Sequence, residues 1–197
     1  VYNIFTNSYN CSGRIEFGSA QSPLITTTPN ISLTASQYIS IENITVGSSS
    51  ARINIGAGSS GTLSSIRNSQ IWGNVSAGNN NFDIDNSSIN GTFTINGSLT
   101  IDDSTISGNT TAGNGVNAGN SVFSGTLTSN NGSINLDGGS VTGLITSNCC
   151  SLTTKDTNMS GGATIQSGMS IDGGTIAGNF RMTSNNPAVI KNVVMTS

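Results

Sequence analysis

The 197-residue sequence has no histidine, and charged residues make up only 8% of it. Without histidine the usual proton shuttle is missing, which excludes Ser/His/Asp and Cys/His catalytic arrangements. Only six residues are basic, and they are scattered along the chain, which is too few to build a phosphate-binding stripe. We therefore expect neither an enzyme nor a nucleic-acid-binding protein, and we expect no cofactor and no metal.

Long hydrophobic runs are also missing, since no apolar stretch reaches the length of a membrane-spanning helix. This excludes a membrane span. The sequence starts at Val1 rather than at methionine and contains little lysine or glutamate. We interpret this as a processed chain whose signal peptide has been removed, and we expect an extracellular or cell-surface location. The low charge leaves little electrostatic repulsion between copies.

Cysteine is scarce and its count is odd, with Cys11 far from the adjacent pair Cys149 and Cys150. The spacing does not resemble a zinc site. In an oxidising compartment Cys11 could bond one member of the pair, or a leftover thiol could crosslink subunits. An equally good interpretation is that all three are small buried side chains.

What the sequence has instead is a regular glycine spacing. Seven glycines follow one another with position numbers that differ by 17 or 18 each time, and they are Gly73, Gly91, Gly108, Gly125, Gly143, Gly161 and Gly178. The residue two positions before each of them is apolar, and the residue two positions after it is mostly apolar. This period is too short for helix pairs and is typical of one coil of a β-helix.

The pattern predicts an all-β, single-domain β-solenoid. Residues 67–192 form the regular coils, each with two or three short strands separated by Gly, Asn, Asp and Ser turns. Residues 1–66 alternate apolar and polar side chains without the strict spacing, so we expect further irregular coils or a small cap there. Residues 193–197 form the terminal edge.

Several acidic residues recur near one place in successive coils, namely Asp85, Asp103, Asp137 and Asp172. Stacked carboxylates could hold calcium or act as the acidic pair of a glycan-cleaving β-helix. We favour the simpler interpretation that they are turn residues, which tolerate positive φ or cap their own turn.

The position three places after each repeating glycine carries hydroxyl side chains in six successive coils: Ser76, Thr94, Thr111, Thr128, Thr146 and Thr164. The preceding residue points inward, so these side chains point outward and form a ladder on a flat, uncharged face. Three interpretations compete: Thr as a favourable strand residue, an ice-binding face, and lateral contact with a glycan or another copy. Trp72, at the edge of this face, is the best candidate for a contact anchor.

The repeated pattern apolar-x-Gly-x-apolar resembles the polymer-forming β-helix of the bactofilin family over residues 67–192. The resemblance implies a narrow β-helix that stacks end to end into filaments without a nucleotide. We therefore expect a secreted structural protein that forms a homopolymer, a fibre or surface appendage joined by strand addition. The alternative is a ligand-binding solenoid that uses the Thr/Asn face to bind ice or glycan. The expected assembly edge is the apolar set Val189, Ile190, Val193 and Val194.

Overall fold

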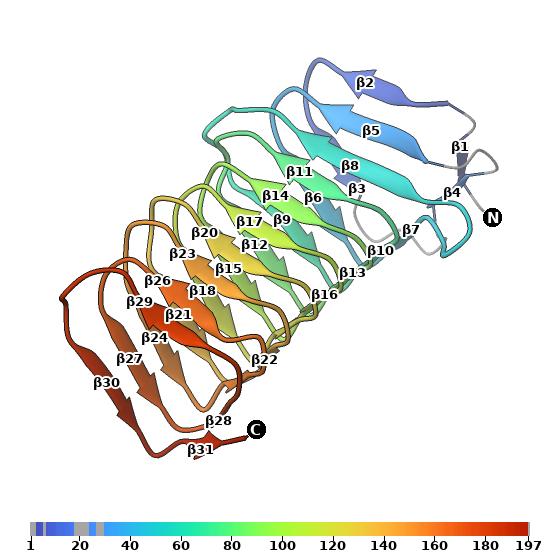
Figure 1. The fold of residues 1–197 in the computed structure, drawn as a ribbon. Coiled ribbons are helices and arrows are strands. Elements are labelled where there is room, and N and C mark those ends of the chain that lie inside the picture. Colours follow the sequence, from blue (N-terminus) through green and yellow to red (C-terminus); the bar gives the residue numbers. More distant parts are fainter. Residues whose placement is uncertain (1–2, 6, 18–23, 27–29, 197) are drawn as a thin grey trace.

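A computed structural model describes residues 3–5, 7–17, 24–26 and 30–196 and confirms the β-solenoid. The chain winds through three parallel sheets, so each coil contributes one strand to each sheet (Figure 1). No helix occurs in these ranges, and thus none that is long and apolar enough to cross a membrane.

The three sheets differ in strand length. Sheet A contains β1 (Asn3–Phe5), β4 (Leu24–Thr26), β7 (Thr45–Val46), β10 (Gln70–Ile71), β13 (Ser88–Ile89), β16 (Thr105–Ile106), β19 (Val122–Phe123), β22 (Ser140–Val141), β25 (Asn158–Met159), β28 (Thr175–Ile176) and β31 (Val194–Met195). Sheet B contains β2 (Tyr9–Cys11), β5 (Ile31–Ala35), β8 (Ile53–Ala57), β11 (Val75–Ala77), β14 (Phe93–Ile95), β17 (Thr110–Ala112), β20 (Leu127–Ser129), β23 (Ile145–Ser147), β26 (Ala163–Ile165) and β29 (Phe180–Met182). Sheet C contains β3 (Ile15–Phe17), β6 (Ile39–Glu42), β9 (Ser64–Arg67), β12 (Phe82–Asp85), β15 (Leu99–Asp102), β18 (Val116–Gly119), β21 (Ile134–Asp137), β24 (Leu152–Lys155), β27 (Met169–Asp172) and β30 (Ala188–Lys191).

The core is a continuous column of apolar side chains enclosed by the three sheets. Strands alternate buried and exposed positions, as in β14, where Phe93 and Ile95 are buried and Thr94 is exposed. The Phe82 and Phe93 rings meet edge to face, with ring centroids 5.0 Å apart. Each coil therefore buries its apolar residues against the coils before and after it.

The strands that precede residue 67 join the same three sheets. Tyr9 pairs with Leu33, and Leu33 pairs with Ile55. Both steps along the chain are longer than the regular step, such as that from Val75 to Phe93, because the turns of these first coils are longer. The described strands of this segment therefore form irregular coils of the solenoid and not a separate cap.

The repeating glycines stack at the corner between sheets A and B. The Gly108 N–H donates a 3.0 Å hydrogen bond to the Gly91 carbonyl oxygen. A Cβ atom added to Gly125 would lie 2.6 Å from the Gly108 carbonyl carbon, far inside van der Waals contact. The glycine spacing therefore reflects a close approach of successive backbones, and among the seven repeating glycines only Gly178 has a positive φ.

The corner between sheets C and A uses a different solution. Asn43, Asn68, Asn86, Asp103, Asn120, Asp156 and Asn192 have φ between 45° and 56° there, and Gly138 and Gly173 take the same place with φ near 75°. Asn, Asp and Gly tolerate this left-handed conformation better than other residues. The structure thus confirms the turn interpretation for Asp103, whereas Asp85, Asp137 and Asp172 are the last residues of strands β12, β21 and β27, one position before the turn.

The third corner, between sheets B and C, absorbs the small variation in coil length. Strand β11 ends at Ala77 and β12 starts five positions later, at Phe82, whereas β14 ends at Ile95 and β15 starts only four positions later, at Leu99. From β10 onward the other two corners keep a constant length from coil to coil.

A ladder of buried serines runs inside the C–A corner, and sequence reasoning missed it. The Ser87 N–H donates to the Ser104 hydroxyl at 2.9 Å, and the Ser104 N–H donates to Ser121 at 3.2 Å. Each hydroxyl in turn donates to the carbonyl two positions before it, at 2.6 Å for Ser104 and Asp102. The signal was present, because serine stands four positions before four consecutive repeating glycines.

Replacing Gly125 by alanine tests the glycine stack. The added methyl group would overlap the Gly108 backbone, and we expect the free energy of unfolding to fall by about 1–3 kcal/mol. In the control Gly168→Ala, the added Cβ meets its nearest atom at 3.5 Å, so we expect a change below about 0.5 kcal/mol. Denaturant midpoints measure both, and equal losses in the two variants would contradict the close-approach explanation.

Replacing Ser104 by alanine tests the serine ladder. The substitution leaves the buried Ser87 N–H without its acceptor, and we expect a loss of about 1–3 kcal/mol in unfolding free energy. The exposed Ser107→Ala change, three positions away, is the matched control and should cost less than about 0.5 kcal/mol. An unchanged denaturation midpoint for Ser104→Ala would show that the ladder adds nothing to stability.

Candidate functional site

The predicted hydroxyl ladder exists as a straight column on the outer face of sheet B. Strand pairing places Ser76, Thr94, Thr111, Thr128, Thr146 and Thr164 in direct register, and Arg181 follows them. Each strand in this stretch contributes only its central residue to the surface, because the residues on either side of it are buried. The column is therefore one side chain wide within the sheet.

The positions beside the ladder are uneven. Asn74 and Asn109 are exposed, but their side-chain oxygens accept hydrogen bonds from the Thr92 and Thr126 backbone N–H groups at 2.9 and 3.1 Å. Leu144 interrupts the polar surface and is 40% exposed. The ladder itself carries no charge before Arg181, and beside it the Arg52 guanidinium donates to the Asn90 carbonyl oxygen at 2.9 Å.

Trp72 lies at the A–B corner immediately before Gly73, and it is only half-buried. Its backbone N–H donates to the Val46 oxygen at 2.8 Å, and its carbonyl accepts the Ile53 N–H at 2.9 Å. The residue therefore occupies a rigid backbone position at the edge of the ladder face, as the sequence predicted.

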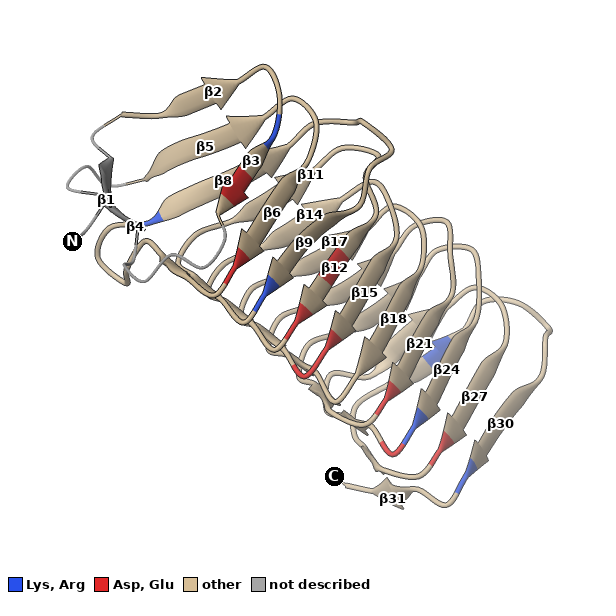
Figure 2. Ribbon diagram, turned by 180° about the vertical axis from the view of Figure 1, so that it is seen from behind, with Lys and Arg blue, Asp and Glu red and all other residues tan. Residues whose placement is uncertain are grey.

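A column of charged residues closes the strands of sheet C, and Figure 2 shows it as a row of red and blue strand ends. In register along the sheet it contains Glu42, Arg67, Asp85, Asp102, Gly119, Asp137, Lys155, Asp172 and Lys191. Three of the six basic residues of the chain lie in it, although they are scattered along the sequence.

One member of the predicted acidic set was placed wrongly. Asp102, not Asp103, lies in register with Asp85, while Asp103 occupies the C–A corner with a φ of 46°. Asp103 was predicted from its distance along the chain to the repeating glycine. The B–C turn that lies between them is one position shorter before β15 than before β12, so the residue in register with Asp85 is one position earlier.

Ion pairs neutralise much of the column. Lys155 Nζ lies 3.5 Å from Asp137 Oδ1, and Lys191 Nζ lies 3.1 Å from Asp172 Oδ2. Hydrogen bonds from Asn192 and Lys191 lower the pKa of the Asp172 carboxyl. Opposite charges on adjacent strands thus stabilise each other across the sheet.

Asp102 has no such partner. Burial raises the pKa of its carboxyl, and repulsion from Asp83, Asp85 and Asp103 acts in the same direction, while a hydrogen bond from the Gly119 N–H opposes the rise. Its side chain lies over Gly119, where a Cβ would collide with Oδ1. The column therefore holds one unfavourable carboxylate beside its only uncharged member.

An open depression of about 620 Å³ surrounds Gly119 on the outer face of sheet C. Its lining includes Thr100, Asn117, Asn135 and Thr153, with Asp102, Asp137 and Lys155 toward the turn, and the apolar residues Ala118 and Leu136. The two carboxylates are already engaged, one by the Gly119 backbone and one by Lys155. The surface offers hydrogen bonds to a polar ligand.

Over the part of the chain that the structure describes, no group of three or more His, Cys, Asp or Glu side chains is arranged to hold a metal ion. In the sheet C column Asp85 and Asp102 are adjacent, and the carboxylates after them are separated by Gly119 and by Lys155.

The structure contradicts the expected bond between Cys11 and one member of the pair, and none of the three cysteines is fully buried; the crosslink between subunits stays a prediction. Cys149 and Cys150 are bonded to each other, and Cys11 is a free thiol. Cys11 belongs to β2, whereas the pair follows β23, seven strands further along sheet B. At about 4.8 Å per strand this is roughly 34 Å, well beyond the span of a disulfide. The Cys11 sulfur instead accepts a hydrogen bond from the Gly13 N–H at 3.4 Å.

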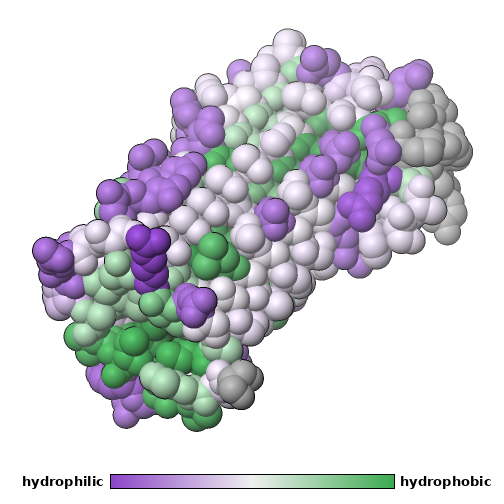
Figure 3. Space-filling view, in the orientation of Figure 1, coloured by the Kyte–Doolittle hydropathy of each residue, from purple (hydrophilic) through white to green (hydrophobic). Residues whose placement is uncertain are grey.

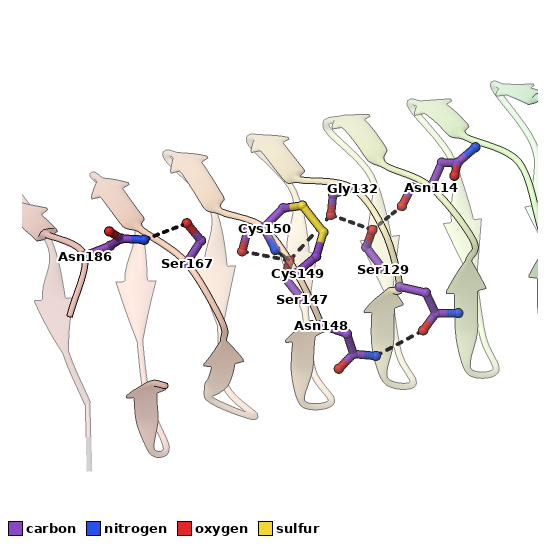
Figure 4. Close-up of a disulfide and its surroundings, with 10 residues drawn as sticks. Asn114, Ser129, Gly132, Ser147, Asn148, Cys149, Cys150, Ser167 and Asn186 are labelled. Atoms are coloured by element: carbon purple, nitrogen blue, oxygen red, sulfur yellow. Dashed lines mark hydrogen bonds between the residues drawn. A yellow bond between two sulfur atoms is a disulfide. The ribbon is translucent and has the colours of Figure 1, made fainter. Parts of the chain in front are cut away.

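The disulfide occupies the variable B–C turn (Figure 4). The Ser147 hydroxyl donates to the Cys150 oxygen at 2.9 Å and accepts the Cys150 N–H at 3.3 Å. Ser129 makes the equivalent bond to Gly132 in the preceding coil, at 2.7 Å. The cysteines therefore replace ordinary turn residues without altering the hydrogen bonding of the turn.

The expected assembly edge lies on and between the two last strands, β30 and β31. Val189, Ile190 and Val194 are 49%, 40% and 59% exposed, and Met195, which ends the same apolar run, is 73% exposed. Val193 differs, because it packs against the core. Figure 3 shows that hydrophobic surface gathers over this end of the molecule.

Replacing Asp102 by asparagine tests the electrostatic repulsion on Asp102 in the charged column. A carboxyl whose folded-state pKa is raised binds protons more tightly in the folded state, so its ionisation lowers stability as the pH rises. Asparagine keeps an acceptor for the Gly119 N–H and removes the charge. We expect a higher melting temperature than wild type at pH 7 and a smaller difference at about pH 3, below the ordinary Asp pKa of about 3.9.

Asp172→Asn is the matched control for this test. The pKa of Asp172 is lowered, so its charge stabilises the folded state at neutral pH and this contribution is lost on acidification. The control should lower the melting temperature at pH 7. A destabilising Asp102→Asn change at pH 7 would contradict the assigned repulsion.

The geometry thus offers three surfaces: the hydroxyl ladder on sheet B, the charged column with its depression on sheet C, and the apolar terminal strands. Comparison of the chain with protein-family models, curated proteins and solved structures finds no match.

Proposed function

We propose that the protein is a non-catalytic structural solenoid that assembles with itself, end to end, by strand addition. The observation that carries this proposal is the uncovered apolar end formed by β29, β30 and β31. Four of the seven large hydrophobic residues that are exposed in the described chain lie on these strands. Contiguous apolar surface of this kind marks interaction sites.

The backbone at this end supports the same proposal. Each of the three sheets terminates here, so β29, β30 and β31 each pair with a neighbour on one side only. An unpaired strand edge presents a row of N–H and C=O groups that another strand can complete. Three such edges, one from each sheet, offer a whole coil as a template.

A shallow hollow lies between the terminal strands. It has a volume of about 220 Å³, and Ile176, Phe180, Ile190 and Met195 contribute apolar side chains to its wall. In every regular coil these inward positions are covered by the next coil. The most economical occupant is therefore another coil of the same kind.

The low charge favours assembly because it leaves little repulsion between copies. The resemblance to the bactofilin β-helix points to the same end-to-end filament, and the scarcity of charge fits an extracellular fibre or surface appendage.

A second candidate function is ligand binding at the hydroxyl ladder, to ice or to a glycan. The direct register of six hydroxyls favours it. Its narrow width and the interruption at Leu144 make it the weaker candidate.

Electron microscopy of the purified protein at rising concentration tests assembly. We expect filaments from the wild type and a marked loss of filaments from Ile190→Asp, which places a charge on the apolar end. Leu144→Asp is the matched control, since Leu144 is equally exposed at 40% but lies on the side of the solenoid. Circular dichroism verifies that both variants fold.

Monomeric particles at every concentration would rule out self-assembly and favour the ladder as the functional surface. Equal loss of filaments in both variants would show that the apolar end has no special role.

A further inference from the structure

The depression on sheet C lies where one position of the charged column carries no side chain. That position is Gly119, which is in register with Asp102 on one side and Asp137 on the other. Neighbouring strands are about 4.8 Å apart, so the backbones of Asp102 and Asp137 are separated by roughly 10 Å. The depression has a volume of about 620 Å³, which falls within the range of small-molecule sites, about 300–1,000 Å³.

The fold does not require glycine at this position. Gly119 does not have a positive φ, unlike Gly138 and Gly173. A Cβ atom added to Gly119 would meet only the carboxylate end of the Asp102 side chain, which can move, whereas one added to Gly125 would meet backbone. Glycine weakens a strand, and in strands it often marks a place where a ligand approaches the backbone closely. The open position at Gly119 therefore points to a ligand.

A second outward column of sheet C runs beside Gly119, and it contains Thr100, Asn117, Asn135 and Thr153 in direct register. Asn135 Nδ2 donates a hydrogen bond to Asn117 Oδ1 at 2.8 Å. This bond orients both amides and leaves the Asn117 amide nitrogen as a donor and the Asn135 amide oxygen as an acceptor. With the two threonine hydroxyls, donors and acceptors extend over three strand spacings, roughly 14 Å.

The charges around the depression disfavour anionic ligands. Lys155 Nζ lies 3.5 Å from Asp137 Oδ1, so these two charges offset each other. Asp102 accepts a hydrogen bond from the Gly119 N–H, but a carboxylate has about four lone-pair sites, so it can accept more. One negative charge is thus left unbalanced, which repels phosphate, sulfate and uronic acid groups. A hydroxyl group, by contrast, donates a strong charge-assisted hydrogen bond to a carboxylate.

We propose that this depression binds a neutral oligosaccharide that lies across β15, β18, β21 and β24. One sugar unit sits over Gly119 and donates hydroxyl hydrogen bonds to the Asp102 carboxylate. Hydroxyl groups of the same or the next unit accept from the Asn117 amide and donate to the Asn135 oxygen. The site lies on sheet C, not on the hydroxyl ladder of sheet B, and it ends two strands before β30, so it does not depend on self-assembly.

Gly119→Lys tests the site by filling it. The new side chain would lie between Asp102 and Asp137, as Lys155 lies between Asp137 and Asp172. Opposite charges on adjacent strands stabilise a sheet, so we expect a melting temperature at or above that of the wild type. We expect the affinity for a neutral oligosaccharide to fall by about tenfold or more. Ser107→Lys adds the same charge at an exposed position outside the depression and should leave the affinity unchanged.

Asp102→Asn tests the carboxylate while keeping the size of the side chain. It removes the charge that strengthens the hydrogen bonds from the sugar, and we expect the affinity to fall by about tenfold. The same change relieves the repulsion on Asp102, so the variant should be no less stable than the wild type at pH 7. A loss of binding in this variant therefore cannot come from unfolding.

The probe is a glycan array that carries neutral, uronic-acid-containing and sulfated oligosaccharides. Calorimetric titration with the neutral member that gives the strongest signal then measures the affinity of each variant. We expect the wild type to prefer neutral members. Binding that favours charged members, or no binding to the array, would overturn the proposal. Wild-type affinity in Gly119→Lys would also overturn it and would leave the sheet B ladder as the glycan-binding candidate. Filament formation is a separate measurement, so each of these results leaves self-assembly untouched.

Discussion

The constraint on which the structure depends is that each coil lies one strand spacing, about 4.8 Å, from the coil before it. Every residue of a strand therefore sits directly on its counterpart in the neighbouring coil. On the flat sheets this is easily satisfied, because side chains alternate inward and outward. At a corner the backbone turns and successive peptide groups come closest. Glycine recurs at the A–B corner because a Cβ on Gly125 would occupy the position of the Gly108 backbone.

The same constraint divides the three corners into different roles. The A–B corner leaves no room for a side chain at the glycine position. The C–A corner needs a left-handed residue, and in five coils a buried hydroxyl follows it, at Ser69, Ser87, Ser104, Ser121 and Thr157. The B–C corner is free to gain or lose a residue, because its strands keep their register on either side. It is also where Cys149 and Cys150 form their disulfide without disturbing the Ser147 hydrogen bonds.

This division explains what the sequence could predict. The fold, the inward columns and the hydroxyl ladder follow from the glycine spacing, since the strands of sheets A and B lie at a constant distance from that glycine. Asp102 was misplaced because the variable turn lies between it and the glycine. The cysteine pairing could not be predicted, because it depends on the number of coils that separate Cys11 from the other two cysteines. The buried serines were overlooked because serine is common throughout the chain, although Ser87 and Ser104 hold the same place in their coils.

Stacking like on like also sets what the surface and the ends can do. A column of identical charges would repel itself along its whole length, and the sheet C column avoids this by alternating Asp137, Lys155, Asp172 and Lys191. The hydroxyl ladder avoids it by carrying no charge until Arg181. Nothing within such a stack limits the number of coils, because each new coil needs only the matching strand register and the opposite charge. Phe180, Ile190 and Lys191 end their columns, so the next coil that covers the equivalent residues inside the solenoid is missing for them.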